Sequence, residues 1–312
     1  MKTMMRVSEA QHEKQRKKVS NQDELGRVFL VLLLYGILFL ILAEFLQGRV
    51  ADEGWILIIA GVLSSVPAGI YLIRRPRGEG PSGARRKVSV RILAVLFMYD
   101  LTLNLLAAQL EVPSEALMNL LGISAQTENA AGGDATAALL LYICLLAPLL
   151  EELIFRGVLL GSLKKYGMLP AIVVSAFFFG IMHHDFYQGL SAFLGGIIYG
   201  YAAYRYSFWA GVILHAANNT FTQLPLGSGE AGENGNLLYF LIFLICAAVS
   251  AAGAVRYLLR IRKQKRNGEK RADSGEICGN TASVSEIWKN SGFWVMMIFD
   301  LFFLAMQSFH RI

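Results

Sequence analysis

The sequence predicts an all-α fold, a polytopic transmembrane helical bundle of about eight membrane-spanning helices. Of its 312 residues 55% are hydrophobic and only 17% are charged, and the mean hydropathy is +0.47. Soluble globular domains carry about 25% charged residues. Most lysine and arginine residues lie in blocks beside apolar runs, which is typical of loops next to a membrane and argues against a nucleic-acid-binding protein.

Eight apolar runs, separated by charged residues or by Gly and Pro, predict the helices in chain order. The first run, 27–47, is longer than the core of a signal peptide and has no small-residue cleavage site behind it, so we expect it to stay as an anchor. The others lie at 54–73, 89–110, 136–163, 169–184, 187–204, 208–222 and 236–258. A further apolar segment, 292–309, is short and contains Asp300, so it is expected to lie in the membrane interface or to form a ninth span.

The distribution of lysine and arginine predicts the orientation. Seven of them lie in residues 1–27, seven in 74–91 and eight in 256–271, whereas 111–135 and 223–235 hold none. Because loops on the cytoplasmic side are enriched in these residues, both ends of the eight-helix core are expected in the cytoplasm. We expect the protein to span the cell membrane many times, in a bacterial plasma membrane, and to have the lipid bilayer as a partner.

The expected organisation has five parts. They are a cytoplasmic N-terminal tail (1–26), three helices with an outer loop (27–135), a core of four helices (136–222), an eighth helix (223–261) and a basic cytoplasmic tail with a short apolar segment (262–312).

Three of the predicted helices carry polar residues at a common depth. At a rise of 1.5 Å per residue, Glu151, His183 and Asn219 each lie about 20 Å from the inner end of their helix, and His215 about 15 Å. A charged side chain at the centre of a bilayer costs about 2.5–3.5 kcal/mol on insertion scales. Ionisable groups at this depth are therefore expected to pair with one another or to line a functional cavity.

The same polar residues form three motifs in order: EELIFR (151–156), FGIMH (179–183) and HAANN (215–219). They resemble the EExxxR, FxxxH and HxxxN motifs of the CPBP family of intramembrane proteases, which includes CAAX-prenyl endopeptidases and Abi-like bacteriocin-processing or self-immunity proteins. The resemblance covers about residues 145–222. It implies an intramembrane endopeptidase acting on a membrane-anchored protein or peptide.

Hydrolysis of a peptide bond requires an activated water and a stabilised oxyanion. We expect Glu151 to act as the general base, with Arg156 holding Glu152 ionised and His183 orienting the water. The resemblance implies that His215 and Asn219 stabilise the oxyanion; an interhelical hydrogen bond is the structural alternative for Asn219.

Zinc is left open by the sequence. Glu151, His183 and His215 are a plausible ligand set with a free position for water, but no HExxH motif places two histidines on one helix. A non-proteolytic scaffold or a bacteriocin self-immunity protein with the same fold is the alternative function. A proton-coupled transporter is disfavoured because the chain shows no inverted repeats, and the oligomeric state stays open.

Four further residues have mainly structural interpretations. His184 and Asp185 are expected to form the end of a helix rather than to take part in catalysis. Gly196 and Gly200 form a GxxxG pattern, which favours close packing of helices within the chain over a dimer interface.

Overall fold

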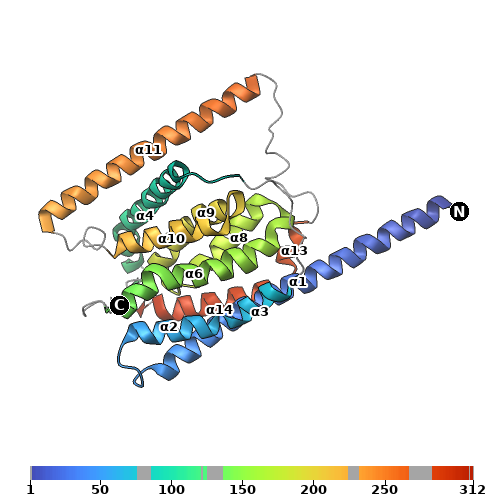
Figure 1. Cartoon of the computed structure of the whole chain (residues 1–312), viewed down its shortest axis with the longest axis horizontal. Coiled ribbons are helices and arrows are strands. Elements are labelled where there is room, and N and C mark those ends of the chain that lie inside the picture. Colours follow the sequence, from blue (N-terminus) through green and yellow to red (C-terminus); the bar gives the residue numbers. More distant parts are fainter. Residues whose placement is uncertain are drawn as a thin grey trace.

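The computed structural model describes residues 2–75, 86–120, 122–124, 136–223, 232–266, 283–308 and 310–311. The fold is a polytopic helical bundle, as predicted (Figure 1). Within the described residues the only β structure is one antiparallel pair of two-residue strands, β1 (Ile123–Ser124) and β2 (His310–Arg311). Helices therefore position the whole candidate site.

The α-helices are Lys2–Leu46 (α1), Glu53–Ser64 (α2), Val66–Arg74 (α3), Val90–Asn119 (α4), Ala137–Leu141 (α5), Ala147–Glu152 (α6), Gly161–Leu163 (α7), Met168–Ile181 (α8), Phe186–Arg205 (α9), Phe208–Thr222 (α10), Gly232–Arg266 (α11), Ser285–Trp288 (α13) and Ser291–Ser308 (α14). Two π-helical segments, Tyr142–Leu146 (η1) and Leu153–Leu160 (η2), and a 3₁₀ turn, Lys164–Tyr166 (η3), join α5, α6 and α7 into one continuous run.

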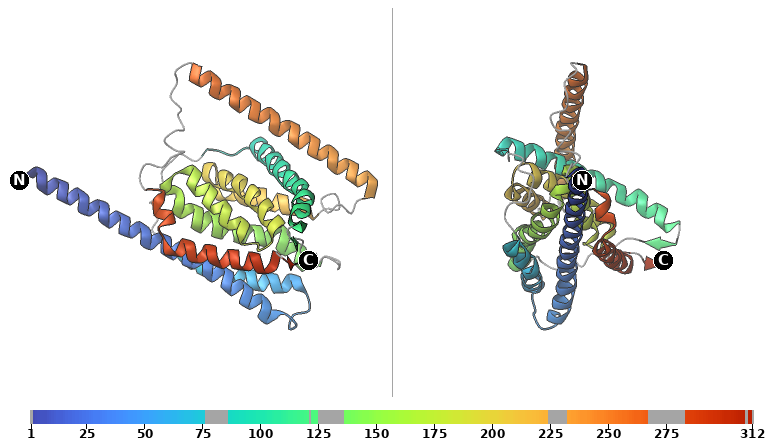
Figure 2. Two further views of the ribbon diagram at one scale, coloured as in Figure 1. Left: turned by 180° about the vertical axis from the view of Figure 1, so that it is seen from behind. Right: turned by 90° about the vertical axis from the view of Figure 1, so that its right-hand side faces the viewer.

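The bundle has a central group of helices with others on two sides. The run from α5 to η3 lies with α8, α9 and α10 in the centre, while α1, α2, α3 and α14 cover one side and α4 and α11 the other (Figures 1 and 2). The N-terminal part of α1 projects beyond the bundle (Figure 1). The expected tail 1–26 is thus helical from Lys2 and continuous with the first apolar helix.

Six helical segments are long and apolar enough to cross a membrane, rather than the eight expected. Three of the predicted spans, 169–184, 187–204 and 208–222, correspond to α8, α9 and α10, which are not among the six. Helix α8 has 14 residues and α10 has 15, so each is about 21–23 Å long against a hydrocarbon core of about 30 Å. The count of eight is therefore not confirmed.

Helix α14 settles part of the uncertainty about the C-terminal apolar segment. Ser291–Ser308 meets the length and composition of a membrane span, and it lies beside α1 (Figures 1 and 2). Phe293 packs against Phe29 of α1 and Phe178 of α8, with ring centroids 5.6 and 5.2 Å apart. The segment inside the expected tail 262–312 is thus a packed helix of the bundle.

Glycines allow α8 and α9 to approach closely. A Cβ at Gly196 would lie 3.0 Å from the Phe179 ring and 3.2 Å from Ala176, and one at Gly200 would lie 3.3 Å from Ile172. All three contacts are within the chain, in agreement with the interpretation of the GxxxG pattern as internal packing.

Candidate active site

Glu151 and Glu152, at the end of α6, have different surroundings. The Glu151 side chain is 13% exposed and its Oε2 lies 3.6 Å from Nε2 of His215. The Glu152 side chain is fully buried, and its Oε1 lies 3.1 Å from Nη1 of Arg156. Of the two adjacent carboxylates, only Glu151 can thus be reached by a water molecule without rearrangement of the core.

The guanidinium group of Arg156 is fixed by one hydrogen bond, one ion pair and an aromatic ring, while its Nε and Nη1 make no hydrogen bond among the described residues. Its Nη2 donates a hydrogen bond to the Gly196 carbonyl oxygen at 3.0 Å, and its charge lies 4.6 Å from the centroid of the Phe179 ring. The Arg156 side chain has no exposed surface. Since a buried charge is tolerated only where it is paired, the ion pair with Glu152 explains how both groups persist at this depth.

His215, on α10, lies between the two glutamates. Its Nδ1 is 3.3 Å from Glu152 Oε1, and the Tyr199 ring stacks on the imidazole with centroids 4.8 Å apart and planes inclined by 11°. Because an ionised carboxylate only accepts hydrogen bonds, Nδ1 is the donor to Glu152. Nε2 is thereby directed toward Glu151.

His183 lies two residues after the end of α8, with its Nδ1 at 2.8 Å from the Phe179 carbonyl oxygen. A carbonyl can only accept, so Nδ1 carries the proton, and Nε2 of the neutral ring is left as an acceptor. The Phe179 ring makes edge contacts with His183 and His215, at centroid distances of 5.1 and 5.3 Å. One phenylalanine thus separates and orients both histidines.

Asn219 makes an interhelical hydrogen bond, the structural alternative considered for it. Its Nδ2 donates to the Ile143 carbonyl oxygen at 3.0 Å. In the π-helical segment η1 the Ala147 amide bonds the Tyr142 carbonyl, five residues back. The next amide in this register would bond Ile143, but residue 148 is a proline and has no N–H. Asn219 therefore supplies the missing donor and ties α10 to the helix that carries the glutamates.

A second polar layer supports the site, and the sequence motifs did not include it. The Tyr199 hydroxyl donates to Asp100 Oδ2 at 3.1 Å, and Asn104 donates to Asp100 Oδ1 at 3.1 Å and to Asn218 at 3.3 Å. Asp100 is the one acidic residue in the apolar run 89–110, which was the signal available for it. No comparable signal marked Tyr199.

His184 and Asp185 terminate α8 and begin α9, as expected for helix-end residues. His184 has a φ of 52°, and its Nε2 lies 3.1 Å from Asp300 Oδ1 on α14. The Asp185 side chain accepts a hydrogen bond from the Gln188 amide at 2.7 Å and so caps α9. The turn that follows His183 is therefore fixed by contacts from α9 and α14.

The ligand set proposed for zinc is not assembled in this structure. Among the residues that the structure describes, no three His, Cys, Asp or Glu side chains are grouped closely enough to hold a metal ion. Glu151 and His215 converge, but they supply only two donors. We therefore derive no chemical step through a metal.

Comparisons with known proteins agree with the motifs. Residues 133–221 match the family model described as Type II CAAX prenyl endopeptidase Rce1-like. Neither the curated proteins nor the solved structures gave a significant match to the chain. The matched range contains α5 to α9 and α10 up to its last residue but one, together with all seven motif residues and the polar contacts among them. The chain therefore carries, in residues 133–221, an Rce1-like type II CAAX prenyl endopeptidase domain of the CPBP family, within a multi-pass helical membrane protein.

Proposed function

We propose that the protein is an intramembrane endopeptidase that hydrolyses a peptide bond of a membrane-associated protein or peptide. The observation that carries this proposal is the pairing of Glu151 with His215 at 3.6 Å, beside a buried ion pair and inside the Rce1-like domain. Six apolar helices support a location in the membrane.

Glu151 is the proposed general base. Its carboxylate takes a proton from a water molecule as the water oxygen attacks the peptide carbonyl carbon. The carbonyl π electrons move to oxygen, and the same carboxyl group then delivers its proton to the leaving amine nitrogen as the C–N bond breaks. A positioned base contributes about 10²- to 10⁴-fold to rate.

His183 and His215 are the proposed partners of the water and of the oxyanion. The Nε2 atom of His183 is free to accept a hydrogen bond from the attacking water, because its Nδ1 is held by the Phe179 carbonyl. His215 can donate from Nε2 to an oxyanion only as an imidazolium ion, since its Nδ1 proton is directed at Glu152. The two negative charges of the glutamates are then balanced by the positive charges of Arg156 and of the His215 imidazolium. The cluster of four side chains has no net charge, which lowers the free-energy cost of burying it.

Asn219 is the proposed second contributor at the oxyanion. One of its two amide N–H groups donates to the Ile143 carbonyl, and the other is the proposed donor to the substrate oxyanion. The same hydrogen bond holds α10 against the segment that carries Glu151, so Asn219 also positions His215 relative to the base.

The test compares peptides released in cells that carry the native chain, Glu151→Gln or the matched control Glu44→Gln. Glu44 is an exposed carboxylate on α1, far along the chain from the motifs. We expect cells with the native chain and cells with the control to release the same set of peptides. The amount of these peptides should fall at least about 100-fold with Glu151→Gln, and equally with a further variant, His183→Gln. Peptides that persist at the native level with Glu151→Gln would rule out the proposed base, and a cellular phenotype that survives this substitution would favour the scaffold or immunity role.

Two finer points belong to the same proposal. The matched family suggests a lipidated CAAX substrate, which can be tested with a farnesylated peptide and an unmodified peptide of identical sequence. Zinc dependence is tested by metal analysis of the purified protein: bound zinc in the native chain that is lost in both Glu151→Gln and His215→Ala would support those residues as ligands.

A further inference from the structure

A cavity of about 1040 Å³ lies outside the candidate active site, between α1, α3 and the segment 162–165. Ser162, in its wall, is 11 residues beyond Glu151 on the same helical run, which corresponds to about 16 Å. None of the seven motif residues lines it. The cavity therefore needs an explanation of its own.

The walls of the cavity are formed by α1 and by α3, which continues the direction of α2. Helix α1 and the α2–α3 run are antiparallel, and their charged residues lie at the same depth. Arg27 lies 19 residues before the end of α1, and Arg74 lies 21 residues after the start of α2. Both are therefore about 30 Å from the turn that joins the two helices. Leu34 and Pro67 line the cavity nearer to that turn. The cavity is thus charged at one end and apolar at the other.

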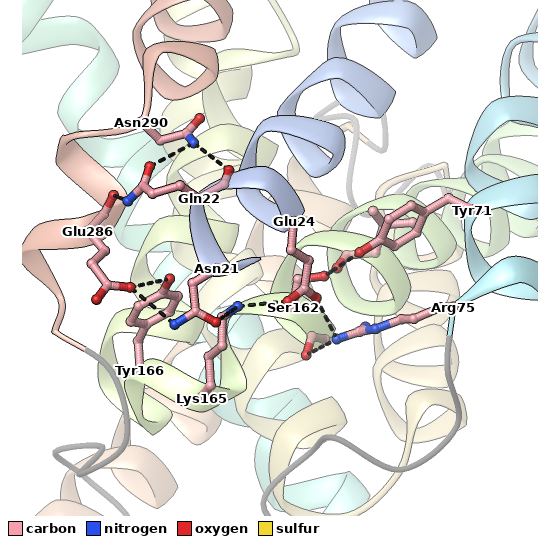
Figure 3. A network of polar contacts seen from close by, with 12 residues as sticks. Asn21, Gln22, Glu24, Tyr71, Arg75, Ser162, Lys165, Tyr166, Glu286 and Asn290 are labelled. Carbon is pink, nitrogen blue, oxygen red and sulfur yellow. Dashed lines mark hydrogen bonds and ion pairs between the residues drawn. The ribbon is translucent and has the colours of Figure 1, made fainter. Parts of the chain in front are cut away.

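The charged end has an excess of positive charge. Arg75 and Lys165 both pair with Glu24, at 3.3 and 2.7 Å (Figure 3). Arg27 and Arg74 also line the cavity, and neither makes a hydrogen bond or ion pair among the described residues. With Asp23 as the other acidic side chain of the lining, four cationic groups face two anionic ones.

The apolar end opens to the surroundings of the bundle. Three of its side chains are partly exposed although they are large and apolar: Leu30 by 53%, Leu34 by 38% and Ile70 by 45%. Since α1 and the α2–α3 run are candidate membrane spans, the exposed side of these residues faces acyl chains. A ligand that reaches this cavity from the bilayer would therefore keep its apolar part in contact with lipid.

We propose that this cavity binds an anionic phospholipid, with the phosphate at Arg27 and Arg74 and the acyl chains along Leu30, Leu34 and Ile70. Guanidinium groups match phosphate oxygens in geometry and charge. The volume is at the upper end of the range for small-molecule sites, so it accommodates a headgroup and the first part of the chains. Glu24 holds Arg75 and Lys165 in place as the back wall of the site (Figure 3).

The test uses native mass spectrometry of the full chain, purified in detergent and exposed to phosphatidylglycerol or phosphatidylcholine with identical acyl chains. We expect retention of phosphatidylglycerol at least about tenfold above phosphatidylcholine. Each arginine near a membrane surface contributes about a fivefold factor to anionic lipid binding, so Arg27→Gln/Arg74→Gln should lower retention about 25-fold. The control Arg260→Gln/Arg262→Gln removes the same charge from exposed positions of α11 and should lower it less than twofold.

A steric variant keeps the proposal testable if the double variant fails to fold. Leu34→Trp adds bulk at the apolar end without removing charge, and it should also abolish preferential retention of phosphatidylglycerol. Equal retention of the two lipids, or an equal loss in the Arg27/Arg74 variant and the α11 control, would overturn the proposal. Displacement of phosphatidylglycerol by millimolar inorganic phosphate would overturn it too, because it would identify an anion site that does not require the lipid.

Discussion

The most apolar windows of helix α11 and of the helical run from Ala137 to Tyr166 have nearly equal mean hydropathy, 2.0 and 2.1, but the two segments differ in how they are packed. In the most apolar window of the α11 span 11% of the residues are buried inside the protein, and in that of the run 33% are. The run carries Glu151, Glu152 and Arg156 in its interior, whereas α11 has Glu233 near its start, its basic residues from Arg256 onward and no charge between them. The buried charges, rather than hydropathy, therefore distinguish the run that carries part of the site from α11.

The largest effect on stability is expected at the buried ion pair. Arg156→Met leaves Glu152 as an unpaired buried charge, which should lower the free energy of unfolding by about 3–5 kcal/mol. Arg260→Met, at an exposed position of α11, should change it by less than about 0.5 kcal/mol. Denaturant titration of both variants in detergent measures the difference. Similar losses in the two would mean that the core and α11 do not differ in the way proposed.

The next effect concerns apolar packing in the same two regions. Leu159 is fully buried and Leu258 is 55% exposed. Leu159→Ala should lower the free energy of unfolding by about 2–5 kcal/mol because it leaves a cavity. The Leu258 side chain faces acyl chains, so Leu258→Ala should lower it far less. Thermal unfolding in matched detergent compares them, and a larger cost for Leu258 would show that α11 is buried against a partner.

A smaller effect is expected where α10 passes Glu152. A Cβ at Gly211 would lie 2.7 Å from Glu152 Oε2, so Gly211→Ala should destabilise the protein by about 1–3 kcal/mol through overpacking and should reduce proteolysis. Gly69→Ala, in α3, meets no atom within 4 Å and should be neutral or stabilising by up to about 1 kcal/mol. Unfolding midpoints and peptide release are the two measurements. Unchanged activity in Gly211→Ala would show that the position of Glu152 is not critical.

The smallest effect is expected at the second polar layer. Tyr199→Phe keeps the ring on His215 but removes the hydrogen bond to Asp100, at an expected cost of about 0.5–1.5 kcal/mol. Tyr199→Leu removes the stacked ring as well and should reduce proteolysis more than stability. If the two variants were equally active, the ring would have no role in positioning His215.

The fold class and the polar centre could be predicted from the sequence because both depend on local composition. Apolar runs reveal membrane helices, and spaced charges reveal the motifs. The number of spans could not be predicted in the same way: α8 and α10 are too short to be counted by length, and α14 was ambiguous because of Asp300. That aspartate is not exposed to lipid, since it contacts His184 across the bundle.

The contacts within the site were less predictable than its members. Glu151 and Glu152 are adjacent in sequence, and nothing local indicates that only the first retains access to solvent. The pairing of Asn219 with Ile143 depends on a π-helical register beside Pro148, and the stacking of Tyr199 on His215 depends on how α9 crosses α10. These are tertiary effects, which hydropathy and residue spacing do not encode.

The π-helical segments on either side of α6 have a consequence for the evolution of this part of the chain. A turn closed by an i→i+5 bond holds one residue more than an α-helical turn. Deletion of a single residue from the α-helical stretch 147–150, which has no such wide turn to absorb the change, would rotate Glu151 by about 100° relative to the residues before the deletion. Glu151 would then swing away from His215. Descendants of this gene are thus expected to tolerate substitutions here far better than insertions or deletions, so the spacing itself is inherited as a functional trait.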